Sequence, residues 1–261
     1  MNIRNVFLVA KKDLLENSGN LFAPIAMTIA LFFLMFSFVS AVYTFLNIIP
    51  FILQFPTFAS QFDINDKIIN PYIGFLAFLS IIIAPIVGAK AFSQEKKLKT
   101  IELLLTYPFT ELELVLGKVI SSFLIYLVFL VFGLLYLFVF IFFYNFMNKG
   151  FIDFGSIWSG FLGLFLLSLA VTSFSVFVSA LFEEVISSLS VSIIGLIFLW
   201  IVNIWGETTN VNIKNIIDAI SLASNFENFS KGVIDLKNVA FFVFFSFLFI
   251  YLTTKILSYR K

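Results

Sequence analysis

The sequence contains neither cysteine nor histidine, and only 12% of its 261 residues are charged. Without these two residue types there are no disulfides, no thiolate nucleophile, no Cys/His metal site and no histidine base. The commonest general base and the most nucleophilic side chain are therefore missing. The net charge of +1 also gives no reason to expect nucleic acid as a partner.

Apolar residues are in excess: 61% of the chain is hydrophobic, and the mean hydropathy is +1.08. Soluble domains have about 25% charged residues, roughly twice the share found here. The composition predicts an all-α integral membrane protein. Nothing in it points to a soluble enzyme.

Hydropathy predicts six membrane spans, each of which needs about 20 apolar residues. The predicted spans are residues 21–45, 72–92, 116–143, 157–181, 185–205 and 239–257. The segment between the first two predicted spans, residues 46–71, carries no charge as far as Phe62 and is interrupted by Asn47, Pro50 and Pro56. We interpret it as an interfacial segment, with a re-entrant hairpin as the alternative. An even number of spans puts both termini on one side.

Residues 1–16 are predicted to form an amphipathic helix in the membrane interface. Its apolar positions follow helical spacing: Ile3, Val6, Phe7, Ala10, Leu14 and Leu15. The segment lacks the order of basic region, apolar core and small-residue cleavage site that marks a signal peptide. A plain cytosolic leader is the alternative.

Lysine and arginine counts in the loops predict the orientation. With the N-terminus inside, the inner segments hold eleven of the sixteen basic residues and the outer segments hold five. The inner ones are Arg4, Lys11, Lys12, Lys90, Lys96, Lys97, Lys99, Lys118, Lys255, Arg260 and Lys261. The two termini and the loop at residues 89–118 are therefore predicted to be cytoplasmic.

That loop is the main polar island between two long apolar runs, and its pattern predicts a short helix. Thr100 suits the N-cap position, and Glu102 in the first turn suits the helix dipole. Three apolar side chains then share one face: Ile101, Leu104 and Leu105. This face could contact a partner, or it could pack back on its own bundle.

The same loop carries a stop signal and a restart signal. Pro108 ends the short helix, because the residue before a proline is driven out of the α region. Thr110 and Glu113 have the spacing of a capping box for the next helix. Residues 94–115 are therefore predicted to be a stiff cytoplasmic loop.

Residues 206–238 form the longest outer segment, before the last span. One helical face is predicted here from Ile213, Ile216, Ile217 and Ile220. We interpret this segment as an outer amphipathic helix that caps the bundle. On the inner side, the tight turn at residues 181–185 predicts that the helices on either side of it are antiparallel neighbours, with Glu183 and Glu184 solvated.

The sequence shows no motif of a nucleotide-binding or catalytic site. Gly117 and Lys118 resemble the end of a phosphate-binding loop, but Leu112 stands where the motif needs glycine and no strand precedes it. No charged residue falls in the middle of a predicted span, which disfavours a proton-coupled carrier. No catalytic, cofactor-binding or metal-binding residue is predicted.

Three stretches carry a resemblance to a known family. Residues 89–96 (Ala-Lys-Ala-Phe-Ser-Gln-Glu-Lys), 100–108 (Thr-Ile-Glu-Leu-Leu-Leu-Thr-Tyr-Pro) and 116–118 (Leu-Gly-Lys) resemble the signature of ABC-2 type permeases, the membrane subunits of ABC exporters. Within that family the pattern is most similar to gliding-motility and nitrous-oxide-reductase-maturation type permeases. The sequence departs from the family pattern at Lys90, Gln94 and Lys99, where Arg, Glu and Gly are common.

The resemblance implies a non-catalytic, multi-pass subunit of the prokaryotic cytoplasmic membrane, with a separate ABC ATPase that binds ATP and magnesium. It implies three kinds of partner: ATPase subunits, a second permease chain in a homo- or heterodimer, and membrane lipid. It also implies a coupling helix that sits in a groove of the ATPase. The residues assigned to this coupling are Glu95, Lys96, Thr100, Ile101, Glu102, Leu104, Leu105, Thr106 and Pro108.

Two other classes of protein fit the composition. One is an ATP-independent carrier or channel, and the other is a structural or regulatory membrane subunit of a larger machine. An ATPase gene beside this one would favour the permease.

Overall fold

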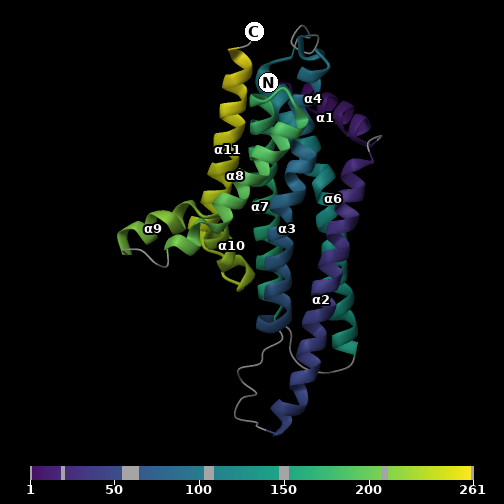
Figure 1. Cartoon of the computed structure of the whole chain (residues 1–261), viewed down its shortest axis with the longest axis vertical. Helices are drawn as coiled ribbons and strands as arrows, with labels where there is room; N and C mark the ends of the chain where they lie inside the picture. Colours follow the sequence, from purple (N-terminus) through teal and green to yellow (C-terminus); the bar gives the residue numbers. More distant parts are fainter. Residues whose placement is uncertain are drawn as a thin grey trace.

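The computed structural model describes residues 2–18, 21–54, 65–102, 109–146, 153–206 and 211–259. All its elements within these ranges are helices. Six of the helical runs are long and apolar enough to cross a membrane, which confirms the predicted all-α fold class. Both chain termini lie at the same end of the bundle, as an even number of spans requires (Figure 1).

The six runs are longer than the predicted spans at several ends. They cover Phe22–Asn47, Asn65–Lys97, Glu111–Phe142, Phe154–Leu181, Val185–Trp205 and Leu236–Ser258. The second run combines the π-helix η2 (Asn65–Ile69) with α3 (Asn70–Gly88) and α4 (Lys90–Lys97). Residues 93–97, which lie beyond the predicted span, therefore continue the membrane helix.

Helix α2 (Phe22–Gln54) also differs from its prediction, which ended the span at residue 45. The helix continues through Asn47 and Pro50, so the first part of the segment 46–71 is helical and its last part belongs to η2 and α3. Residues 55–64 lie outside the described residues. A proline removes one backbone hydrogen bond, but ending a helix in apolar surroundings leaves several groups unpaired, which is the larger cost.

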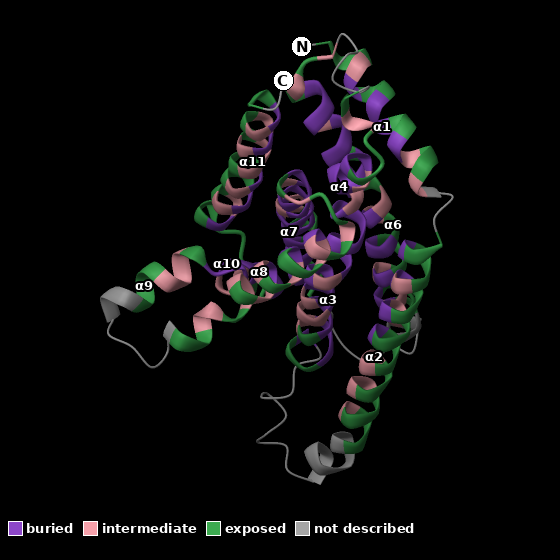
Figure 2. Cartoon of the chain, turned by 45° about the horizontal axis from the view of Figure 1, so that its top comes forward, coloured by how far each residue is buried: buried purple, intermediate pink, exposed green. Residues whose placement is uncertain are grey.

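Two central helices organise the bundle. The most apolar windows of the Asn65–Lys97 run and of α7 (Phe154–Leu181) are 78% and 61% buried, against 17% for α2, α8 (Val185–Gly206) and α11 (Leu236–Ser258). Figure 2 shows the buried residues concentrated on α3 and α7, whereas α2 and α11 are largely exposed. The outer helices therefore present broad apolar faces to lipid or to another subunit.

The prediction of antiparallel neighbours at residues 181–185 is confirmed. Helix α7 ends at Leu181, α8 begins at Val185, and the two helices contact each other. Glu183 and Glu184 are both exposed at this turn.

The segment before the last span forms two helices, α9 (Val211–Ile220) and α10 (Leu222–Ser230). The predicted outer helix is present as α9, but it projects sideways and does not cap the bundle, and its Ile216 and Ile220 are exposed (Figure 1). Helix α9 contacts α8, whereas α10 contacts both α7 and α8. Helix α10 buries Leu222, Phe226 and Phe229, which share one helical face.

Helix α1 (Ile3–Ser18) lies obliquely against the start of α6 (Glu111–Phe146), at the end of the bundle that carries both termini (Figure 1). Val6 and Ala10 of the predicted apolar stripe are buried, whereas Ile3, Phe7 and Leu15 are exposed. A helix with one packed face and exposed apolar side chains suits a membrane interface, and its location there stays a prediction.

Candidate functional site

The candidate site is the end of the bundle where α1, α4, α6 and α7 meet, because the described part of the predicted coupling segment lies there. Glu95 and Lys96 belong to the last turn of α4. Ile101 and Glu102 are helical again after a short break, and Thr100 stands directly before them. Leu104, Leu105, Thr106 and Pro108 lie outside the described residues.

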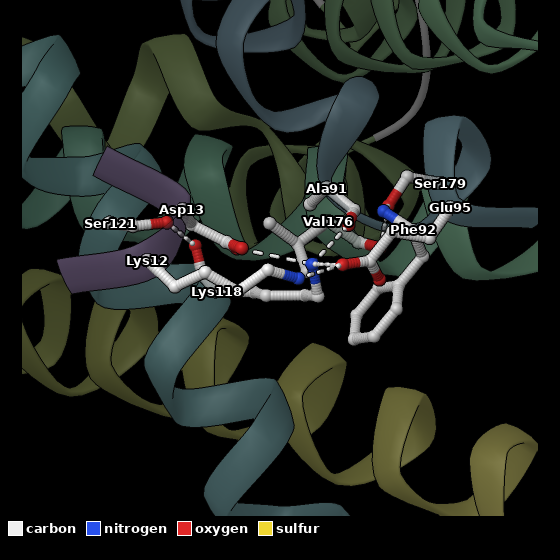
Figure 3. A network of polar contacts seen from close by, with 9 residues as sticks. All are labelled: Lys12, Asp13, Ala91, Phe92, Glu95, Lys118, Ser121, Val176 and Ser179. Atoms are coloured by element: carbon white, nitrogen blue, oxygen red, sulfur yellow. Dashed lines mark hydrogen bonds and ion pairs between the residues drawn. The ribbon is translucent and has the colours of Figure 1, made fainter. Parts of the chain in front are cut away.

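Lys118 of α6 is at the centre of a buried group of charges (Figure 3). Its Nζ lies 2.9 Å from a Glu95 carboxylate oxygen and 3.1 Å from a carboxylate oxygen of Asp13. It also donates a 2.6 Å hydrogen bond to the carbonyl oxygen of Ala91. An ammonium group has three N–H donors, so this one is fully satisfied.

The same group includes a second cation. Lys12 Nζ lies 3.4 Å from Glu95, but the Lys12 side chain is 53% exposed, against 2% for Lys118, 7% for Glu95 and 8% for Asp13. Two lysines therefore balance two carboxylates. We call Asp13, Glu95 and Lys118 the buried ion cluster.

The cluster joins three segments that are far apart in the sequence. Asp13 comes from α1, Glu95 from α4 and Lys118 from α6. Gly117 allows the close approach, because a Cβ added there would lie 2.7 Å from the Val9 side chain of α1. Removing one member of a buried ion pair leaves an uncompensated charge, so the cluster fixes α1 and α4 to α6.

Lys96 extends the connection to α7. Its ammonium group is buried and donates hydrogen bonds to the carbonyl oxygens of Ala180 and Phe182, at the C-terminal end of α7. The last carbonyls of a helix lack partners within the helix and attract cations. The backbone N–H of Phe92 also donates a 3.3 Å hydrogen bond to Ser179 Oγ.

The start of α6 confirms the predicted capping box. The Glu113 backbone N–H donates to Thr110 Oγ1 at 3.3 Å, and the Thr110 N–H donates to the Glu113 carboxylate at 3.2 Å. The same carboxylate accepts hydrogen bonds from the Asn2 backbone N–H and the Asn5 side chain, at 2.5 and 3.1 Å. Glu113 therefore also attaches the start of α1 to α6.

Helix α4 ends in a Schellman motif. The N–H of Thr100 donates to the carbonyl of Glu95 at 2.9 Å, and the N–H of Lys99 donates to that of Lys96 at 3.0 Å. Lys99 has φ of 56°, a left-handed conformation in which glycine is usual. Glycine, which is common here in the family, adopts this conformation without strain, and this chain has a lysine in its place.

We expect Lys99→Gly to raise the free energy of unfolding by up to about 1 kcal/mol, because the left-handed region costs an L-residue about that much. Lys97→Gly is the matched control, since Lys97 is also exposed but helical, and glycine there should lower stability by about 0.5 to 1 kcal/mol. Denaturant unfolding of the purified chain in detergent measures both. Equal losses in the two variants would contradict the assigned backbone role.

The structure separates the predicted coupling residues into two groups. Glu95 and Lys96 are buried and contact their own bundle, so their side chains are not available to a partner. Ile101 is half-buried and packs against a cluster that includes Phe92 and Val119, which supports the alternative that its face packs back. Glu102 is exposed, and the Thr100 hydroxyl contacts the carbonyl of Glu95 at 3.3 Å.

Two functional features were missed from the sequence. The buried ion cluster was missed because the sequence pattern does not pair Lys118 with any carboxylate, and its partners are 105 and 23 positions away. Leu98 was missed because it precedes the predicted helix, yet it is 61% exposed between the exposed Lys97 and Lys99. An isolated apolar side chain between exposed charges could have been noticed.

The comparison with known families agrees with this architecture. The model of the ABC-2 family transporter protein family matches residues 53–260. That range covers most of the chain and includes α4, the described start of the loop after it, and α6 to α11. The chain therefore belongs to the ABC-2 transporter family, and it is a multi-pass permease subunit. No curated protein matches it.

Proposed function

We propose that the chain is the permease subunit of an ABC exporter, and that a separate ATPase subunit binds and hydrolyses ATP with magnesium. In this proposal the chain itself has no catalytic role and holds no cofactor. Its task is to convert closure of the ATPase subunits into movement of the membrane helices.

The observation that carries the proposal is the change from exposed to buried residues at the end of α4. Lys97, Leu98 and Lys99 are exposed at the tip, while Glu95 and Lys96 directly before them are buried. Glu95 connects to α1 and α6 through Lys118, and Lys96 connects to α7. A force applied to the tip would therefore reach four helices without first bending a loose loop.

We place this end of the bundle in the cytoplasm, where ATP is available. The support is the excess of lysine and arginine in the segments at this end, together with the common location of the two termini. We also propose a second permease chain, the same or different, against the apolar faces of the outer helices. The low burial of α2, α8 and α11 within one chain is consistent with that assembly.

A single-cysteine experiment tests both the orientation and the ATPase contact, because the chain has no cysteine of its own. Lys97→Cys places a thiol on the exposed tip. We expect a membrane-impermeant maleimide to label it in inside-out vesicles and not in intact cells. Addition of the ATPase subunit should slow the labelling at least several-fold, because the partner covers the tip.

Lys231→Cys is the matched control at the opposite end. Lys231 is exposed and forms an i,i+4 ion pair with Glu227, whose loss costs little at an exposed site. Its thiol should label in intact cells, at a rate that the ATPase does not change. Labelling of Lys97→Cys in intact cells would overturn the orientation, and labelling that is indifferent to the ATPase would overturn the coupling role of the tip.

A further inference from the structure

A sideways-facing apolar cleft lies between the end of α1, the start of α2 and the middle of α6. Its volume is about 700 Å³, and its walls include Leu14, Leu15, Met27, Leu31, Val128 and Phe132. Of these, Leu15, Val128 and Phe132 expose half or more of their surface. The cleft therefore opens toward the lipid that surrounds the bundle.

The polar groups in the cleft wall do not call for a polar ligand. The Thr28 hydroxyl is already satisfied, because it donates a 2.8 Å hydrogen bond to the carbonyl of Pro24 in the preceding turn. Asn17 lies at the end of α1, at the rim nearest the chain termini. The interior of the cleft suits a hydrocarbon chain.

The depth of the cleft can be estimated from the buried ion cluster. Lys118 contacts Asp13 of α1 and the carbonyl of Ala91 in α4, so these three residues are at one level. The cleft begins at Leu124 of α6, six residues farther along the same helix. At 1.5 Å per residue this is about 9 Å deeper, which is the step from headgroups to acyl chains.

Two lysines are close neighbours of residues in the cleft wall, although neither lines the cleft itself. Lys90 precedes Ala91, and its Nζ lies 5.1 Å from the centre of the Phe22 ring, next to Ala23 in the cleft wall. Lys11 is exposed and lies one helical turn before Leu14 and Leu15. Viewed along the axis of α1, its side chain projects between those of the two leucines. Neither lysine forms an ion pair with a residue in the described ranges.

The charge at this rim is therefore positive. Glu16 is the nearest exposed carboxylate along α1, but five residues correspond to about 140° around a helix, so it faces away from Lys11. The other acidic residue at this level of α1 is Asp13, which is buried against Lys118. An anionic group beside Lys11 would therefore meet no exposed carboxylate on the same face of α1.

We propose that this cleft binds one anionic glycerophospholipid, with an acyl chain between α1, α2 and α6 and the phosphate at Lys11 and Lys90. The ligand would hold α1 against α2 beside the buried ion cluster. Its negative headgroup distinguishes it from zwitterionic lipid, which the apolar walls alone would accept equally well.

Native mass spectrometry of the full chain in detergent tests the proposal, with phosphatidylglycerol and phosphatidylcholine of identical acyl chains as probes. We expect the native chain to retain one phosphatidylglycerol in preference to phosphatidylcholine. Lys11→Gln and Lys90→Gln should each weaken phosphatidylglycerol binding roughly five-fold and leave phosphatidylcholine binding unchanged. Val128→Trp, which fills the cleft, should weaken the binding of both lipids.

Two matched variants control for general effects. Lys255→Gln removes a lysine near the C-terminal end of α11 that lies over the Tyr251 ring and outside the cleft wall. Val131→Trp adds an indole to an exposed position of α6 that does not line the cleft. Neither should change lipid binding. Equal retention of the two lipids by the native chain, or equal losses for Lys255→Gln and Lys90→Gln, would overturn the proposal.

Discussion

Lys118→Met is expected to lower the free energy of unfolding by about 3 to 5 kcal/mol, the range for breaking a buried ion pair by removing one partner. Methionine nearly matches the length of lysine, so the loss is mainly of charge and hydrogen bonds. Asp13 and Glu95 would remain buried without their ammonium partner. Because Lys12 is half exposed, it can compensate Glu95 only in part.

The measurement is denaturant unfolding of the purified chain in detergent, beside Lys12→Met as the matched control. Both variants remove a lysine that contacts Glu95, but Lys12 is largely in solvent, so its loss should cost at most about 1 kcal/mol. The prediction fails if the two variants are equally stable.

Removing all the charges of the cluster separates its electrostatics from its packing. The variant Lys118→Met, Asp13→Asn, Glu95→Gln leaves no uncompensated buried charge, because the remaining Lys12 is half exposed. Buried ion pairs can often be replaced by uncharged groups at little cost. We expect it to regain most of the stability lost in Lys118→Met. A triple variant that is less stable than the single variant would show that shape, and not charge balance, determines the effect.

Local signals were predicted well from the sequence, and distant pairings were not. The capping box at Thr110 and Glu113 could be predicted because both residues belong to one helical turn. The membrane spans could be predicted because hydropathy is a sum over neighbours. The buried ion cluster could not, because nothing in the sequence indicates which of the charged residues Lys118 would meet.

Two predictions from the sequence differ from the structure for the same reason, because the environment of a helix cannot be derived from its local pattern. Pro50 was treated as a helix breaker, although α2 continues past it. The segment that contains α9 is predicted to cap the bundle, but α9 projects sideways with Ile216 and Ile220 exposed (Figure 1), which an apolar environment allows. The sequence pattern predicts a helix in both cases, while its surroundings decide its length and which face is covered.

Leu104→Asp and Leu105→Asp are expected to abolish or severely weaken association with the ATPase subunit. Both positions lie outside the described residues, so the prediction depends on the sequence pattern that gives them one helical face. A carboxylate placed in an apolar contact and left unpaired costs on the order of several kcal/mol. Both variants should insert normally, because the change lies in the loop between two spans.

The neighbouring Leu103→Asp is the matched control, because it adds the same charge to the same loop on the opposite side of the predicted helix. Binding of the ATPase to the reconstituted permease and the transport-stimulated rate of ATP hydrolysis measure the effect. We expect both to survive in Leu103→Asp and to be lost in the other two.

The half-buried Ile101 makes the experiment decisive, since it packs against the cluster that includes Phe92 and Val119, and the same face therefore begins against the bundle. If Leu104 and Leu105 continue that packing, their aspartate variants will lower the stability of the isolated chain, and ATPase affinity will fall only with the folded fraction. If they leave the bundle and enter the ATPase, the isolated chain will keep its unfolding midpoint while association is lost. Full ATPase binding and full stimulated hydrolysis in both variants would remove the coupling assignment from this helix.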